Sequence, residues 1–211
     1  MSKLQPVRGT KDLLPDEKRV HTYIVDLARS TCELYGYSEI STPIFEFSEV
    51  FERTLGDNSD IVTKEMYSFH DKSGDIITLR PENTAGVARA LISNGLQQAL
   101  PLKYFYSGPM FRYERPQKGR LRQFHQIGVE LLGVSEELGD IEIIALGASL
   151  LKALALTNVV KLEINSLGDK ESRQKYRNRL VEYLEKYSSS LSPESKARLE
   201  RNPLRILDSK N

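Results

Sequence analysis

The chain has little cysteine and no long apolar run. Its 211 residues include a single cysteine, Cys32, which excludes an internal disulfide and a cysteine-based zinc site. Because Cys32 falls within an apolar helical pattern, we expect a buried, unreactive thiol and a reducing compartment. The first residues are polar and no stretch approaches about 18 apolar residues. The sequence therefore predicts no signal peptide and no membrane span. We expect a cytoplasmic location.

The chain also lacks internal repeats, low-complexity tracts and an excess of charge of one sign. It contains 30 Lys+Arg and 29 Asp+Glu, which argues against a nonspecific nucleic-acid coat protein but leaves room for a local basic patch. A chain of 211 residues with 39% hydrophobic content can form one globular core with a small appended unit. Since strands and helices mix without regular βαβ alternation, we expect an α+β fold with an antiparallel sheet flanked by helices.

Residue patterns predict the elements along the chain. Pro15 and Asp16 begin an amphipathic helix that ends at Gly36. An extended stretch follows over 38–47, where Pro43 cannot donate to a ladder and so belongs at a sheet edge or an interface. The other predicted elements are a hairpin over 66–79 turning at Ser73-Gly74, a helix over 81–95, a strand at 103–106, a long helix capped by Asp140, and a strand over 159–169.

The character of the chain changes near residue 168. Residues 168–211 carry 11 Lys/Arg and 7 Asp/Glu, a net charge of +4, in two helical segments separated by a Ser-rich turn. Pro193 suits the start of the second helix. We therefore expect a core over residues 1–167 and a separate helical unit over residues 168–211.

The stretch FRYERPQKGRLRQFHQIGVEL, residues 111–131, predicts a hairpin with a basic loop. Side chains alternate between the two faces of a strand. One face of the hairpin is apolar and suits packing under a helix: Phe111, Tyr113, Ile127, Val129 and Leu131. The other is largely polar and contains a glycine, which leaves room for a ligand: Met110, Arg112, Glu114, Phe124, Gln126, Gly128 and Glu130.

The polar face has the chemistry to hold a nucleotide beside an amino acid. Arg112 and Arg120 offer planar donors for phosphate or carboxylate groups, and Phe124 offers a ring for stacking. From the residues alone, a solvated sheet face with cross-strand Arg–Glu pairs is an alternative. The loop RPQKGR equally suits a charged turn that discourages edge pairing.

The residues FRYERPQKGRLRQFHQ resemble motif 2 of the class II aminoacyl-tRNA synthetases, in the form typical of the histidyl-tRNA synthetase family. VRGTKDLLPDE resembles the family's amino-terminal strand and turn, and LYGYSEISTPIFE its motif 1, with Pro43 at the dimer interface. KEMYSFHDKSGDIITLRPENTAG resembles its substrate loop, and NPLRILDSKN part of its insertion domain. The resemblance implies a class II catalytic core over 1–167 and the beginning of a helical insertion domain over 168–211.

The resemblance implies a histidine–tRNA ligase. Such an enzyme activates histidine with ATP and Mg²⁺ to histidyl-adenylate and transfers it to tRNA(His), mainly by positioning and charge stabilisation. By carry-over, Arg112 is the catalytic residue, between the histidine carboxylate and the α-phosphate. The implied ATP-binding residues are Arg112, Glu114 at the adenine amino group, Arg120 at the outer phosphates, and Phe124 stacked on the adenine.

Other positions carry over to histidine and tRNA. Glu82, with Thr84 beside it, matches the contact to the α-ammonium group, while Gln126 and Glu130 match positions that recognise the amino acid. From the residues alone, Glu82 equally suits the N-terminus of a helix. Asn83 departs from the family pattern, which has glycine there. The loop that approaches the tRNA acceptor end contains Arg115, Gln117 and Lys118.

The sequence also sets limits on the assignment. The three histidines, His21, His70 and His125, have no ligand spacing, so we expect structural roles and no metal site. The chain lacks the family's glycine-rich motif ending in Glu-Arg, an RGLDYY-like segment and an anticodon-binding domain. We therefore expect an incomplete chain that forms a homodimer but is inactive alone.

Two alternative functions remain at this stage. One is the histidine-sensing regulatory subunit of ATP phosphoribosyltransferase, which shares the fold, and the other is a dimerising scaffold without a ligand. The intact motif 2 loop favours the ligase, whose expected partners are a second copy, tRNA(His), histidine and ATP.

Overall fold

The computed structural model describes residues 4–55, 59, 61–166 and 168–207. The chain divides into two compact units, residues 1–160 and residues 161–211, which are described separately. Within the described residues, no helix is long and apolar enough to cross a membrane.

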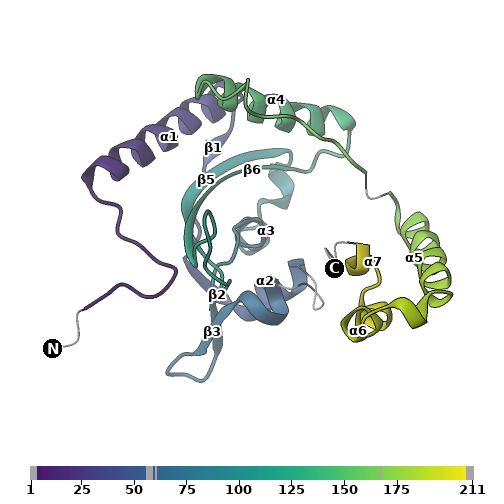
Figure 1. Ribbon diagram of the computed structural model, residues 1–211. Coiled ribbons are helices and arrows are strands. Elements are labelled where there is room, and N and C mark those ends of the chain that lie inside the picture. The colour runs from purple at the N-terminus through teal and green to yellow at the C-terminus, as the bar shows by residue number, and fades with distance from the viewer. Residues whose placement is uncertain (1–3, 56–58, 60, 167, 208–211) are drawn as a thin grey trace. The chain divides into compact units, whose positions relative to one another are not determined.

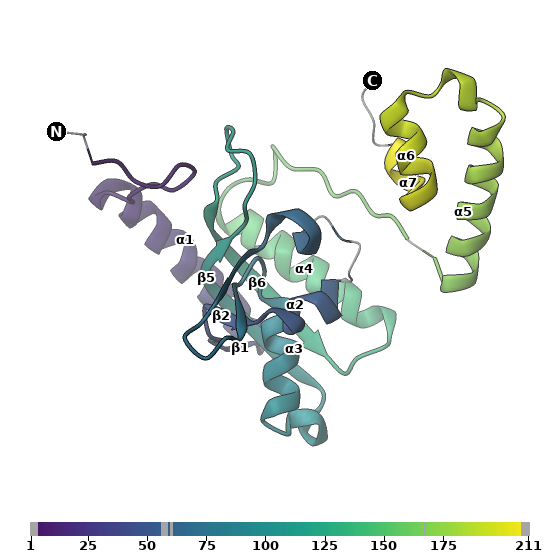
Figure 2. The ribbon, with the colours of Figure 1, turned by 90° about the horizontal axis from the view of Figure 1, so that it is seen from below.

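The centre of the first unit is a sheet of three strands in the order β1-β5-β6. The two long strands, β5 (Leu102–Phe111) and β6 (Gln123–Leu132), form the predicted antiparallel hairpin, and β1 (Ser38–Glu39) pairs in parallel with β5. Met110 lies opposite Phe124, and Gly108 opposite Gln126. The predicted alternation of faces along β6 is therefore confirmed, and the loop of the hairpin projects from one end of the sheet (Figure 2).

Two helices cover the outer face of the curved hairpin, α1 (Pro15–Leu34) and α4 (Glu137–Ala153) (Figure 1). A buried cluster joins them to the sheet: Cys32 of α1, Tyr37, Phe105 of β5 and Leu146 of α4. Burial raises the pKa of the Cys32 thiol to about 11, in agreement with the expected buried, unreactive cysteine.

The inner face of the hairpin packs on α3 (Thr84–Ser93). Val87 of α3 forms a buried cluster with Tyr106 and Met110 of β5, and Phe124 of β6 packs at its margin. The Tyr106 ring occupies the space that a Cβ at Gly128 would need. The glycine on the polar face thus makes room for a tyrosine of the same sheet.

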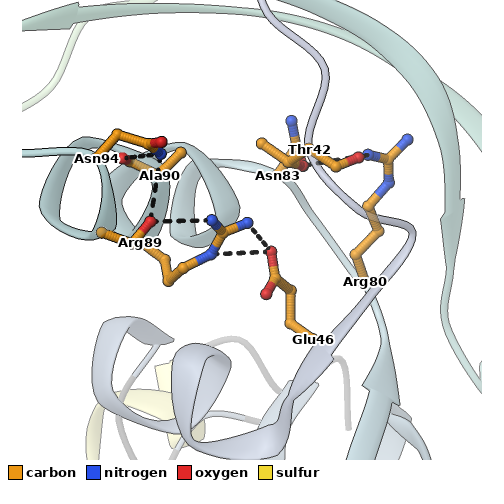
Figure 3. Close-up of polar contacts among 8 residues, drawn as sticks. Thr42, Glu46, Arg80, Asn83, Arg89, Ala90 and Asn94 are labelled. Carbon is orange, nitrogen blue, oxygen red and sulfur yellow. Dashed lines mark hydrogen bonds and ion pairs between the residues drawn. The ribbon is translucent and has the colours of Figure 1, made fainter.

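A second sheet has the order β2-β4-β3, with every pair antiparallel. Its strands are β2 (Phe45–Phe47), β3 (Tyr67–His70) and β4 (Ile76–Leu79), so the predicted hairpin over 66–79 is confirmed. On one side, Thr78 is fully buried and exchanges hydrogen bonds with Ser48 and Ser68 at 2.6 and 2.7 Å. Arg89 of α3 pairs with Glu46 of β2 and ties the helix to this sheet (Figure 3).

Short helical segments complete the first unit. They are α2 (Ser48–Leu55), the π-helical turn η1 (Ile61–Glu65) and the 3-10 turn η2 (Leu96–Ala99). The helix predicted over 81–95 begins only at Thr84, because Pro81, Glu82 and Asn83 do not have helical conformation.

Two local predictions were wrong. The long helix α4 begins at Glu137, so Asp140 lies inside its first turn instead of capping it, where a carboxylate still favours the positive end of the helix dipole. The predicted strand over 159–169 is absent from residues 159–166, and Leu167 lies outside the described residues. Leu162 and Ile164 are 65% and 74% exposed, which shows that alternation alone does not form a strand without a neighbouring ladder.

The second unit is helical, as predicted. It contains α5 (Lys170–Glu185), the Ser-rich turn η3 (Ser188–Ser190), α6 (Pro193–Arg201) and α7 (Leu204–Leu207). Asp169 and Ser192 cap α5 and α6 by accepting the backbone N–H groups of Ser172 and Ser195. The division of the chain at residues 160 and 161 precedes the change of composition at 168.

Candidate functional site

The motif 2 arginine and glutamate lie just beyond the end of β5. Alternation predicted that the strand continues through Glu114, but the ladder ends at Phe111. The Glu114 N–H turns back to the Arg112 carbonyl at 2.8 Å, and the Tyr113 N–H donates to the Glu65 carbonyl at 2.7 Å. The Tyr113 ring lies between Tyr67, at 5.5 Å between centroids, and the Arg122 guanidinium, at 4.0 Å. These contacts fix the base of the loop.

The four residues expected to bind ATP lie together. The Arg112 guanidinium is 5.2 Å from the centre of the Phe124 ring, and Arg112 Nη1 is 4.0 Å from Glu114 Oε1. Arg120 Nη1 reaches Glu114 Oε2 at 3.1 Å. Since the Arg120 side chain is 64% exposed, this ion pair contributes little free energy, and Arg120 can exchange Glu114 for a phosphate at small cost.

A hydrogen bond joins the residues expected to bind ATP to the segment of those expected to bind the substrate histidine. Arg112 Nε donates to the Pro81 carbonyl at 2.9 Å, and Pro81 directly precedes Glu82. Arg112 therefore lies between the aromatic ring of Phe124 and the loop that carries Glu82, which suits a group shared by two substrates.

Glu82 is buried at the N-terminus of α3. Its two carboxylate oxygens accept the N–H groups of Thr84 at 2.6 Å and Ala85 at 2.9 Å. The helix-terminal role considered for Glu82 is thus present in the structure. Each oxygen accepts only one of these bonds, so the carboxylate retains lone pairs for an ammonium donor.

Thr84 connects Glu82 to a second carboxylate. Its hydroxyl donates to Glu130 Oε1 at 2.7 Å, and the Tyr106 hydroxyl donates to the same oxygen at 3.5 Å. Burial raises the pKa of the Glu130 carboxyl, and the charge of Glu82 adds to this rise, whereas the hydrogen bonds from Thr84 and Tyr106 oppose it. Two acidic groups around one threonine favour a cationic ligand.

Gln126 lies on β6 between Phe124 and Glu130. Its Oε1 atom is buried and accepts no hydrogen bond from the described residues. A buried carbonyl oxygen without a donor costs about 1–3 kcal/mol, so it offers a favourable position for a ligand N–H group. All the residues expected to bind histidine therefore lie on β6 or at the start of α3.

Replacement of Glu130 by glutamine is expected to stabilise the protein at neutral pH. A raised pKa in the folded state gives stability that is complete at low pH and is lost as the pH rises through the folded-state pKa. The neutral Glu130→Gln variant avoids this loss, so its Tm should exceed that of the original by a few degrees at pH 7.5 and converge with it toward pH 4. Thermal unfolding followed by circular dichroism measures both, with the exposed Glu33→Gln as control. A lower Tm at pH 7.5 would contradict the prediction.

The residues expected to contact tRNA lie in the hairpin loop. Arg115, Gln117 and Lys118 are exposed, and backbone hydrogen bonds between Gln117 and Arg120 close the turn. Arg115 lines a hollow of about 410 Å³ together with Arg8, Tyr113, Glu114, Pro116 and Arg122. Pro43 is exposed in the extended segment between β1 and β2, as expected of a proline outside a ladder.

The histidine side chains are not part of the site, since His125 lies between Phe124 and Gln126 in the sequence but on the opposite face of β6. His21 of α1 and His125 of β6 meet edge to face at 4.3 Å between ring centroids, and burial lowers the pKa of both. The ring of His70 lies 3.2 Å from the Gly74 carbonyl within its own hairpin. Among the described residues, no group of three or more His, Cys, Asp or Glu side chains is placed to hold a metal ion.

Sequence reasoning missed a buried polar network beside Glu82. It contains Arg80, Thr42 and Asn83 (Figure 3). The one available signal was Gly108, because a glycine within a strand often marks a close approach. A Cβ at Gly108 would collide with the Arg80 guanidinium, which passes across the strand at that point.

This arrangement, an antiparallel hairpin that holds Arg112, Glu114 and Phe124 beside the carboxylates of Glu82 and Glu130, has the fold of a class II aminoacyl-tRNA synthetase catalytic core. The family model for histidyl-tRNA synthetase matches residues 9–168. The chain therefore belongs to the histidyl-tRNA synthetase family.

Similar proteins agree with this assignment. The chain is 64% identical over 211 residues to the histidine–tRNA ligase of Rhodospirillum rubrum, and 59% identical over 210 residues to that of Gluconacetobacter diazotrophicus. Each alignment includes the whole of this chain and only 51% of the relative. The chain therefore spans about half the length of the curated relatives it matches.

Solved structures show the same fold. Apo S. aureus histidyl-tRNA synthetase aligns with a TM-score of 0.74 and 36% identity, covering 97% of this chain and 48% of that one. A protein from Bacillus halodurans described as an ATP phosphoribosyltransferase regulatory subunit/histidyl-tRNA synthetase aligns with a TM-score of 0.66 and 28% identity, covering 94% and 55%. The expected α+β class II fold is confirmed.

Proposed function

We propose that the chain provides the histidine- and ATP-binding residues of a histidine–tRNA ligase. The observation that supports the proposal is the continuous path from Phe124 through Arg112 to Pro81 and Glu82, in which a ring suited to stacking on a nucleotide lies near a carboxylate suited to an ammonium group. Residues 1–167 form the catalytic core, and residues 168–211 begin a helical insertion domain. The protein acts in the cytoplasm.

The first reaction is adenylation. A carboxylate oxygen of histidine attacks the α-phosphorus of ATP, a new P–O bond forms, and the bond to pyrophosphate breaks. Arg112 neutralises charge on the carboxylate and the α-phosphate, while Arg120 leaves Glu114 to contact the outer phosphates. Phe124 stacks on the adenine, and Glu114 accepts from its amino group.

Histidine is held by the acidic site. Its ammonium group binds to Glu82, and its imidazole binds near Gln126 and Glu130, where a buried acceptor and a carboxylate face the ligand. In the second reaction, a ribose hydroxyl of tRNA(His) attacks the carbonyl carbon of the adenylate, and AMP leaves. No nucleophile of the chain is needed in either step.

Mg²⁺ enters with ATP as part of the substrate. Mg²⁺ keeps several waters and binds mainly through substrate phosphates with one or two carboxylates.

A chimaeric enzyme tests this function. The matched half of the R. rubrum ligase, to which the chain is 64% identical, is replaced by this chain, and histidine-dependent exchange between ATP and pyrophosphate is measured. The chain alone is assayed in parallel. Exchange in the chimaera that requires histidine supports the ligase, whereas a folded, soluble chimaera without exchange would overturn it.

The regulatory-subunit alternative gives a different result in the same assay. The similar B. halodurans protein is named as an ATP phosphoribosyltransferase regulatory subunit/histidyl-tRNA synthetase, and this double name keeps the candidate open. A histidine sensor would bind histidine, as measured by calorimetry, and would show no pyrophosphate exchange in the chimaera.

The exposed face of the second sheet supports a homodimer. Phe45, Phe47 and Phe69 are 56%, 58% and 47% exposed, and strand pairing places all three on one face. Pro43 leads directly into this strand. An aromatic patch of this kind on a soluble protein suits a second copy of the chain.

Replacement of Phe45 by aspartate is expected to produce a monomer. A carboxylate introduced into the apolar contact would have to be buried without a partner in the dimer, which raises the dissociation constant by several orders of magnitude. Light scattering coupled to size exclusion measures the mass, with Lys72→Asp in the exposed turn of the same sheet as control. A Phe45→Asp variant that remains dimeric would refute this interface.

The basic loop is expected to bind the acceptor end of tRNA through phosphates. Arg115→Ala and Lys118→Ala should each weaken binding of an acceptor-stem minihelix. The slope of log K against log salt should fall by about 1 for each phosphate contact that is lost. Fluorescence anisotropy at several salt concentrations measures the slope, and Lys72→Ala is the matched control. Unchanged slopes in both loop variants would exclude these contacts.

A further inference from the structure

Asn83 lies between two of the residues expected to bind histidine, Glu82 and Thr84, and is only 1% exposed. It occupies the position before the first residue of α3, where an asparagine side chain ordinarily accepts a backbone N–H of the helix. Here the side chain makes no such bond, because Glu82 accepts the N–H groups of Thr84 and Ala85 instead. The capping function therefore does not explain an asparagine at this position.

The Asn83 side chain reaches Thr42 beside the first turn of α3, where Gly86 leaves room for both side chains (Figure 3). Its Oδ1 accepts the Thr42 hydroxyl at 2.6 Å and Arg80 Nη1 at 3.4 Å. Its Nδ2 is buried and has no partner among the described residues, which costs free energy. The structure therefore keeps a polar side chain in a position where only its oxygen is used.

Arg80 holds the same segment from a second direction. It is 6% exposed, and its guanidinium donates to the Pro109 carbonyl at 3.0 Å and to the Thr42 carbonyl at 3.1 Å. Burial lowers the pKa of Arg80, and the nearby Tyr106 and Glu46 oppose this shift. A buried cation bound by these two carbonyl groups links its own segment to the two segments that supply them.

We propose that Asn83 is a positioning residue for Glu82, acting through its bond to Thr42 and its contact with Arg80. The side chain anchors the turn before α3 to the segment that leads into β2, and this anchor sets where the Glu82 carboxylate lies. The proposal rests on the proposed function for its link to histidine.

Amide exchange tests the anchor without any ligand. The N–H groups of Thr84 and Ala85 bind Glu82, so their exchange rates, measured by NMR on the 211-residue chain, report the position of its carboxylate. Asn83→Ala and Thr42→Val should each accelerate this exchange about fivefold to tenfold, the effect of losing one hydrogen bond. Thr42→Ser and Asn83→Asp keep the donor and the acceptor, and both should retain slow exchange.

A double-mutant cycle separates the proposed bond from general damage to the fold. Thr42→Val should add little to exchange in the Asn83→Ala background, because the bond is already absent. Additive effects of the two changes, or unchanged exchange at Thr84 and Ala85 in either single variant, would overturn the proposal.

Histidine binding distinguishes this proposal from the proposed function. In calorimetric titrations of the chain, Asn83→Ala should weaken histidine binding about tenfold, and Asn83→Asp should restore it. Equal affinity in Asn83→Ala would refute the positioning role while leaving the histidine site intact. If the original chain binds no histidine while amide exchange at Thr84 and Ala85 still responds to Asn83→Ala, the proposed histidine site is refuted. The bond between Asn83 and Thr42 is then still supported.

Discussion

Replacement of Arg112 by alanine is expected to reduce histidine-dependent pyrophosphate exchange in the chimaeric ligase by about 100- to 1000-fold. Arg112 is the only residue of the candidate site described above that touches both the ring of Phe124 and the loop of Glu82. Its loss removes the charge between the two reacting groups and leaves Glu114 with one basic partner instead of two. The effect should fall mainly on kcat, because charge develops in the transition state.

Two further variants test whether the positive charge of Arg112 is sufficient, and whether the loss of exchange is specific to this arginine. Arg112→Lys keeps the charge but not the planar pair of donors, so it should recover only a small part of the activity. Arg29→Ala, which removes an exposed residue of α1 that pairs with Asp26 and Glu39, should leave exchange unchanged. Exchange in Arg112→Ala above about one tenth of the original rate would exclude Arg112 as the catalytic residue.

Replacement of Gly128 by alanine is expected to destabilise the first unit. An added Cβ would collide with the Tyr106 ring, which is 4% exposed and cannot move into solvent without opening the cluster around Val87. Overpacking of this kind costs about 1–3 kcal/mol, and each kcal/mol lowers Tm by about 2–4 °C in a chain of this size. The displaced tyrosine would also withdraw its hydroxyl from Glu130.

Gly147→Ala provides the matched control for this prediction. Gly147 lies within α4, and an added Cβ there would meet nothing within 4 Å beyond its own turn of helix among the described residues. Alanine at that position should raise stability by about 0.5–1 kcal/mol, because glycine is unfavourable inside a helix. Thermal unfolding of the two variants should therefore shift in opposite directions, and a Gly128→Ala variant as stable as the original would exclude the predicted collision.

The parts of the fold that depend on local periodicity were predictable from the sequence. The hairpin over 102–132 has the predicted faces because alternation along a paired strand is fixed by its geometry. The turn at Ser73-Gly74 and the proline at the start of α1 were equally local signals. For the same reason, Phe124, Gln126 and Glu130 could be placed together on one face in advance.

Features that depend on where a strand stops were not predictable in the same way. Arg112 still bonds to Arg122 of the opposite arm, but Tyr113 bonds to Glu65, a residue far away in the sequence, and Glu114 turns back to Arg112. The apolar alternation of residues 159–166 indicated a strand, but the described residues supply no neighbour for it. Pattern alone cannot report a missing or a distant partner.

The network around Asn83 shows the same limit. Thr42 lies 41 positions before Asn83, and Pro109 lies 29 positions after Arg80. No local pattern links these positions, and an arginine before a proline at the end of a strand is ordinarily solvent-exposed. Only the three-dimensional arrangement shows that this arginine is buried beside the candidate site.

The position of Tyr113 provides an optical probe of the loop. The chain contains no tryptophan, so Tyr113→Trp would introduce a single indole whose emission is resolved from that of the remaining tyrosines. The indole would lie under the Arg122 guanidinium, as the tyrosine ring does at 4.0 Å, and a positive charge at that distance alters its fluorescence. Stopped-flow mixing with nucleotide would then follow rearrangement of the loop in real time, from a residue outside the proposed ligand contacts.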